Sequence, residues 1–202
     1  MAEKEERRSR YSDGFALTRY TMPVVMQMAE VIPGGFFIYR EDEKRELIYA
    51  NRKVLEIYGC ETLDEFKALT GFTFPGMVHP DDFEKIQKSI DEQIDDAEGD
   101  SMDHVDYRII SKDGSIKWVD DFGHYSYSPE YGDVYYVFIN DITEQKELRS
   151  EIKHDENDIA RFRKDINEVL EKIDDLNSSG DESRISEGLV AIKEELEDIM
   201  KE

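Results

Sequence analysis

The spacing of hydrophobic residues predicts a helix and then a hairpin in the first quarter of the chain. Apolar residues three or four positions apart within 14–31 are typical of one face of a helix, which Pro23 starts or kinks. A Pro-Gly-Gly cluster directly after this stretch ends the helix. Two apolar runs at 35–40 and 47–51 flank a charged turn, so we predict a β-hairpin there.

Three helices are predicted next, at 52–58, 62–69 and 81–96. Thr62 precedes the second helix with Glu65 three residues later, which is the spacing of a capping box. The third helix has apolar residues three and four apart on one face, and these are Phe83, Ile86, Ile90 and Ile94.

Three strands complete this part of the chain, at 104–111, 115–128 and 133–141, with an Asp-Gly hairpin signal between the first two. The order of elements is typical of an α+β fold with one five-stranded antiparallel sheet. The last strand is apolar at almost every position, so we expect it to be buried on both faces. Short helices would cover one face and helix 14–31 the other.

From Thr143 the apolar spacing changes to seven. Ile recurs at every a position from 152 to 173, and the d positions are mostly apolar except for Asp155. This pattern predicts a parallel two-stranded coiled coil over 144–177, followed by a turn and a second amphipathic helix at 183–202. The predicted dimer seam is Leu148, Ile152, Ile159, Phe162, Ile166, Val169 and Ile173.

Composition and charge exclude several classes of partner. The 202 residues carry a net charge of −23, which disfavours binding to nucleic acid or to an anionic membrane surface, because both need neutralising Lys and Arg. Cys60 is the only cysteine, so an internal disulfide and a Cys-based zinc cluster are excluded. No apolar run approaches the length of a membrane span, and no secretory signal is present, so we expect a cytoplasmic protein.

Five sequence strings in the middle of the chain are informative together: IPGGFFIYR, LIYANRKVLEIYG, MVHPDDFEKI, YRIISKDGSIKWV and VFINDITEQKEL. In this order and spacing, they resemble a PAS domain of the type common in bacterial signalling proteins. The most specific element is the triplet Asp141-Ile142-Thr143 running into the heptad helix. The resemblance implies a PAS fold with an N-terminal tail and cap helix (1–29), the PAS domain itself (30–143), a signalling helix (144–177) and the second helix (183–202).

The resemblance also implies a function. Such domains bind a small ligand between helices and sheet, or dimerise, and pass the change into the following coiled coil. We therefore expect a homodimer that signals to a downstream protein or domain, as in two-component systems. The expected relay residues are Asp141, Ile142, Thr143 and Asn51. Asp141 and Thr143 can cap the first turn of the helix, and the resemblance favours an added role in tethering it to the sheet. Capping is the simpler role for Asn51.

A set of large apolar side chains mixes core and pocket lining, and sequence alone does not separate the two. The candidates for a ligand pocket are Phe37, Ile57, Tyr107, Trp118, Phe122, Tyr136 and Phe138. The ligand is not identified by the sequence. Haem bound through His79 is disfavoured because that residue lies at a helix start. A flavin-reactive role for Cys60 is disfavoured because the Asn-Cys-Arg-Phe string of the light-sensing PAS subfamily is absent.

Two further candidate sites have simpler explanations. No metal is expected, because the acidic stretch before the third predicted strand lacks EF-hand spacing; its members are Asp91, Asp95, Asp96, Glu98, Asp100 and Asp103. His154 lies on the heptad helix before an acidic residue, so a histidine phosphotransfer hairpin is the alternative function. The usual basic residue, Thr or Asn, and Pro downstream are missing, and no ATP-binding segment follows. We expect a surface histidine and no enzyme.

Overall fold

The computed structural model describes residues 17–96, 102–179, 188 and 190–193. The chain divides into two compact units, residues 1–144 and 145–202, which are described separately below. The first holds the sheet and its helices and is called the sheet unit.

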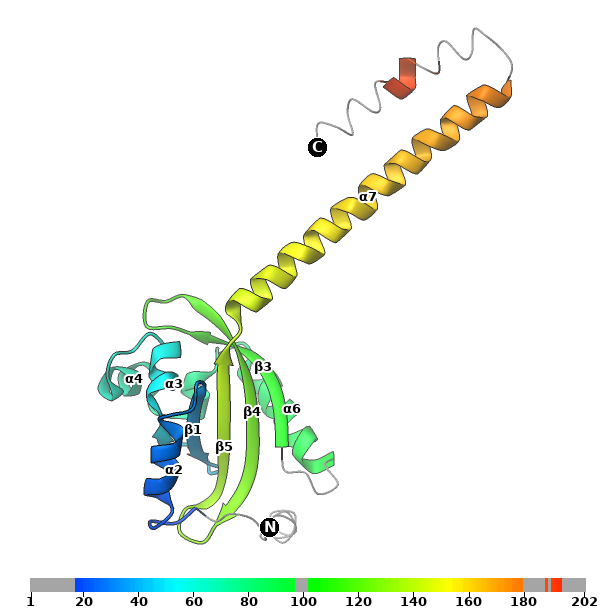
Figure 1. Ribbon diagram of the computed structural model, residues 1–202. Helices are drawn as coiled ribbons and strands as arrows, with labels where there is room; N and C mark the ends of the chain where they lie inside the picture. Colours follow the sequence, from blue (N-terminus) through cyan, green and yellow to red (C-terminus); the bar gives the residue numbers. More distant parts are fainter. Residues whose placement is uncertain (1–16, 97–101, 180–187, 189, 194–202) are drawn as a thin grey trace. The chain divides into compact units, whose positions relative to one another are not determined.

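The sheet unit contains the predicted five-stranded antiparallel sheet (Figure 1). Its strands lie in the order β2-β1-β5-β4-β3, so β5 is central and β2 and β3 are the edges. The sequence placed the start of β3 two residues too late. The strand bounds are β1 Gly35–Arg40, β2 Leu47–Ala50, β3 Met102–Ile110, β4 Ile116–Ser128 and β5 Gly132–Asp141.

Helix α4 begins where its capping residue predicts, whereas the described part of the predicted helix 14–31 is helical only over α2. Thr62 Oγ1 accepts a hydrogen bond from the Glu65 backbone N–H (3.2 Å) at the start of α4, and Gly71 ends that helix in the left-handed conformation. A four-residue helix, α5, was missed because one turn carries no hydrophobic period. The helix bounds are α2 Met22–Ala29, α3 Arg52–Ile57, α4 Leu63–Thr70, α5 Phe74–Met77 and α6 Phe83–Asp96.

The sheet has two faces with different cores. The inner face packs against α3 to α6 and contains the larger buried cluster, with Phe37, Tyr107 and Ile139 fully buried. The outer face carries a smaller cluster in which Phe36 and Ile38 pack with residues of α2. The helices therefore cover one face and α2 covers part of the other, as the apolar pattern of β5 predicted.

The expectation that β5 is buried on both faces is confirmed only in part. Val134 and Tyr135 are both buried, but Phe138, near the end of the strand, is 39% exposed. The cover on the outer face does not extend to that side chain, so the apolar pattern overstated the burial.

Helix α7 (Thr143–Ser179) is continuous over the predicted signalling helix. The second predicted helix, 183–202, lies mostly outside the described residues. The residues of this range that the structure describes, 188 and 190–193, are helical. Within the part of the chain that the structure describes, no helix is long and apolar enough to cross a bilayer.

Candidate functional site

The end of β5 and the start of α7 are joined by a short hydrogen-bond network that we call the junction. Asp141 Oδ1 accepts from both the backbone N–H (3.0 Å) and the hydroxyl (2.6 Å) of Thr143. Thr143 Oγ1 in turn accepts from the backbone N–H of Trp118 on β4 (2.9 Å), and the Ile142 N–H donates to the Trp118 carbonyl (2.9 Å). The first residue of α7 is therefore bonded to a neighbouring strand as well as to its own chain end.

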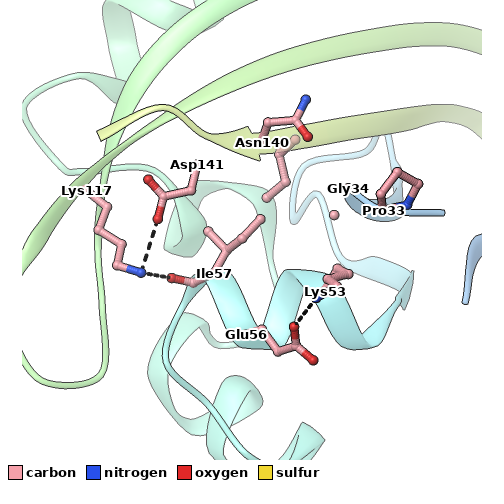
Figure 2. A pocket seen from close by; sticks show the side chains of 10 residues that line it. Pro33, Gly34, Lys53, Glu56, Ile57, Lys117, Asn140 and Asp141 are labelled. Carbon is pink, nitrogen blue, oxygen red and sulfur yellow. Dashed lines mark hydrogen bonds and ion pairs between the residues drawn. The ribbon is translucent and has the colours of Figure 1, made fainter. Parts of the chain in front are cut away.

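Lys117, which the sequence did not single out, extends the junction to α3. Its Nζ lies 3.2 Å from Asp141 Oδ2 and donates to the carbonyl of Ile57 (3.0 Å), as Figure 2 shows. Burial alone would raise the pKa of Asp141, but the hydrogen bonds from Thr143 and the ammonium of Lys117 outweigh it and lower that pKa. The carboxylate is therefore ionised at neutral pH and holds both partners.

A pocket of about 360 Å³ opens beside the junction. It contains two ammonium groups, each paired with a carboxylate: Lys53 with Glu56 (2.5 Å) and Lys117 with Asp141 (Figure 2). Its formal charges therefore balance. The lining residues are Pro33, Gly34, Gly35, Lys53, Glu56, Ile57, Lys117, Ile139, Asn140 and Asp141. We call it the junction pocket.

Asn51 does more than cap a helix. Its Oδ1 accepts from the Val54 N–H at the start of α3 (3.1 Å) and from the Phe36 N–H of β1 (2.9 Å). Its Nδ2 donates to the carbonyls of Ala29, which ends α2 (2.8 Å), and Gly34, which lines the junction pocket (3.1 Å). The side chain is 1% exposed, and the amide links three elements that local sequence does not connect.

The structure does not bring the seven predicted pocket residues together. Phe37 and Tyr107 lie on the inner face. Strand alternation places the β4 and β5 members on the outer face, where Phe122 pairs with Phe138 and the Phe138 ring lies 4.8 Å from that of Phe36. Ile57 is the one residue of these seven that lines the junction pocket.

Residues of the predicted dimer seam lie on α7 with much of their apolar surface uncovered within the chain. The four nearest its start are 46 to 58% exposed, whereas Val169 is buried and Ile166 and Ile173 are half-buried. The exposed four are Leu148, Ile152, Ile159 and Phe162. Contact with a second chain remains a prediction.

The other candidates have local roles. His79 Nδ1 accepts from the Asp81 N–H at the turn before α6 (3.3 Å). Cys60 is buried, and burial raises the pKa of its thiol, which reduces thiolate reactivity. His154 is exposed and lies 3.4 Å from Asp158 one turn later. Of the acidic stretch, Asp95, Asp96, Glu98 and Asp100 lie outside the described side chains.

Two carboxylates on the inner face are buried, and the sequence singled out only one of them, Asp103, as part of the acidic stretch. The Tyr107 hydroxyl donates to Asp121 Oδ2 (2.6 Å), whereas Asp103 Oδ1 has no hydrogen-bond partner. Burial raises the pKa of Asp121 well above its usual range and that of Asp103 to about 7. Gly123 leaves room for the Asp103 carboxylate, since a Cβ there would lie 2.4 Å from Oδ1.

Comparison with known proteins identifies the fold. A family model described as PAS fold matches residues 47–139. An RNA-binding light-oxygen-voltage receptor aligns with a TM-score of 0.51 and 14% identity, over 70% of this chain and 39% of that chain. A LOV protein of Rhodobacter sphaeroides aligns at 0.50 and 12%, over 62% of this chain and 69% of that chain.

The PAS domain of a protein from Colwellia psychrerythraea aligns at 17% identity and a TM-score of 0.48, over 61% of this chain and 98% of that chain. No curated protein matches the sequence. At these identities, the structural likenesses show a shared fold and do not identify a ligand or a reaction.

Proposed function

Because this chain contains a PAS domain, we propose that it is a sensory or regulatory module. A small ligand or a partner protein binds the sheet unit, and the change passes through Asp141, Ile142 and Thr143 to α7. Helix α7 pairs with that of a second copy as a parallel coiled coil. A downstream signalling protein or domain then responds to the change in the coil.

The junction is the observation that supports this proposal. Thr143 is held by β4 and by Asp141, and Lys117 connects the same carboxylate to α3. No Gly or Pro separates Asn140 from Leu148, so the chain has no flexible break between strand and helix. Each hydrogen bond contributes about 1 kcal/mol, which is comparable with the few kcal/mol that separate two signalling states.

The junction pocket offers a route by which a ligand reaches this network. A ligand that carries both a positive and a negative group can replace the partners in the ion pairs Lys53–Glu56 and Lys117–Asp141. Displacing Lys117 frees Asp141 from α3 and leaves only Thr143 as its partner among the contacts described above. Binding of a ligand in the junction pocket is therefore coupled to Thr143, the first residue of α7.

A double-mutant cycle tests the relay without a known ligand. Val137→Ala opens a cavity in β5, and spin labels at Lys153 on two copies of α7 report distances across the coil, with Cys60 replaced by Ala. We expect Val137→Ala to change the distance distribution in the parent protein. It should have no effect when Asp141→Ala and Thr143→Ala are also present.

Glu144→Ala is the matched control, because this exposed first-turn residue lies outside the junction network. It should leave the response intact. A response that survives the double substitution at Asp141 and Thr143 would mean that these residues only cap the helix. Absence of any response in the parent protein would argue against the relay itself.

We further propose that the described part of the chain binds and relays and does not catalyse. The rival is phosphotransfer through His154, whose exposed imidazole on α7 is accessible to a partner. Incubation with a phosphorylated response regulator distinguishes the two. Phosphate that appears on the protein and is lost in His154→Gln would establish the rival.

A further inference from the structure

We propose that His104, Asp106 and Asp120, on the outer face of β3 and β4, bind a first-row divalent transition-metal ion. Their ligand atoms all lie within 4.8 Å of one another. His104 Nε2 lies 3.9 Å from Asp106 Oδ1 and is in hydrogen-bond contact with Asp120 Oδ1. The ligands of a tetrahedral zinc ion lie about 3.3 Å apart, because each bond is about 2.0–2.1 Å long. Small side-chain rotations therefore complete the site.

The strand register places the three side chains together. Asp106 on β3 lies directly opposite Asp120 on β4, and the next pair on the same face is His104 with Phe122. Two carboxylates directly opposite on neighbouring strands repel each other. Arg108, the next residue on this face of β3, is bonded to Asp82 on the α6 side. A bound cation would be attracted by both carboxylates of the strand pair.

The imidazole is held in position by an aromatic neighbour. The His104 ring is stacked on that of Phe122, with centroids 4.1 Å apart and an interplanar angle of 3°. This stacking restricts the ring plane and directs Nε2 toward Asp120. The arrangement is independent of the junction, so the site does not depend on the signal relay proposed above.

The donor set selects the class of ion. One imidazole nitrogen and two carboxylate oxygens suit zinc and its first-row neighbours better than calcium or magnesium, which prefer oxygen ligands alone. His104 is 54% exposed at its side chain and Asp120 23%, so water can fill the remaining coordination positions. Binding would cross-link the edge strand β3 to β4.

Titration calorimetry with Zn²⁺ on the full chain tests the site. We expect one strong site per chain, with His104→Gln and Asp120→Asn each weakening its affinity by about tenfold or more. The matched control is His124→Gln, because His124 lies on the same face of β4 outside the cluster and should bind Zn²⁺ as the parent does. Circular dichroism verifies that each variant is folded.

A second measurement needs no variant that removes a ligand. Zn²⁺ added to the parent protein should shift the side-chain NMR signals of one of its four histidines and leave the other three unchanged. The proposal is overturned if millimolar Zn²⁺ produces no binding heat or if no histidine signal shifts. Equal affinity in the parent and in His104→Gln also overturns it.

Discussion

The sheet unit and α7 differ in how far they bury their apolar side chains. On the inner face of the sheet, Phe37 and Tyr107 are fully buried by the chain's own helices. On α7, Ile152 and Ile159 are more than half exposed although they recur at heptad spacing. Burial of apolar surface is the main favourable contribution to folding. The sheet unit therefore has its own source of stability, whereas the first half of α7 needs a second surface to gain it.

Placing charges in the seam tests this comparison with the largest expected effect. Ile159→Lys with Ile166→Lys puts four ammonium groups into the seam of a dimer, and each unpaired buried charge costs several kcal/mol. We expect the dimer to dissociate and the sheet unit to keep its unfolding temperature. Analytical ultracentrifugation measures the first and calorimetry the second.

The control changes the same helix away from the seam. Asn157→Lys and Lys164→Glu alter charge at exposed positions and should leave the dimer intact. A parent protein that is monomeric at high micromolar concentration would remove the basis for the comparison.

A large-to-small substitution in the inner face should have the opposite pattern. Phe37→Ala removes a fully buried ring, and such changes cost about 3–5 kcal/mol of unfolding free energy. We expect this loss in denaturant unfolding of the sheet unit, with association through α7 retained wherever the protein stays folded. Phe138→Ala on the partly exposed outer face is the matched control and should cost much less.

Periodic elements of both regions could be predicted from the sequence, whereas a single-turn helix and the division of side chains between the sheet faces could not. The strands and the long helix α7 followed from periodicity, because alternation and seven-residue spacing are local patterns. The coiled coil itself remains a prediction. The same patterns did not predict α5, which is a single turn. Residue type alone placed Phe122 and Phe138 in the same pocket set as Phe37, although strand register separates the two faces.

The site residues also differ in whether their contacts are local in sequence or depend on tertiary packing. Asp141 and Thr143 were predicted because their contact spans two residues of one chain segment. Lys117 reaches Ile57 across 60 residues, and Asn51 reaches Ala29 across 22, so both contacts depend on tertiary packing. His104 and Asp120 meet only through the β3–β4 register. No short-range spacing encodes these contacts.

A pH titration sharpens the comparison inside the sheet unit. Burial raises the pKa of Asp103 from 3.8 to about 7, so the folded state keeps a proton that the unfolded state loses near pH 4. The folded state binds more protons in this window, and stability falls as pH rises from about 4 to about 7, by up to about 1.4 kcal/mol per pH unit. Buried Asp121 acts in the same direction.

Asp103→Asn should remove part of this pH dependence. We expect its unfolding free energy to exceed that of the parent at pH 8 by more than at pH 5, measured by urea denaturation. Asp113→Asn is the control, because that exposed carboxyl has a pKa lowered by Ser115 and lacks the burial effect. Parallel pH profiles for the parent and Asp103→Asn would show that Asp103 ionises normally.

The smallest expected effect is at the junction, where the two regions meet. Thr143→Ala removes the hydroxyl that accepts from the Trp118 N–H and donates to Asp141. It should cost the sheet unit about 1 kcal/mol, since the lost hydrogen bonds are replaced in part by water. Thr143→Ser keeps the hydroxyl and should restore most of this loss. Hydrogen exchange of the Trp118 amide distinguishes a residue that tethers α7 to β4 from one that only caps the helix. If Thr143 is a tether, this amide exchanges faster in Thr143→Ala and at nearly the parent rate in Thr143→Ser. Equal rates in all three proteins would leave Thr143 no role beyond starting α7.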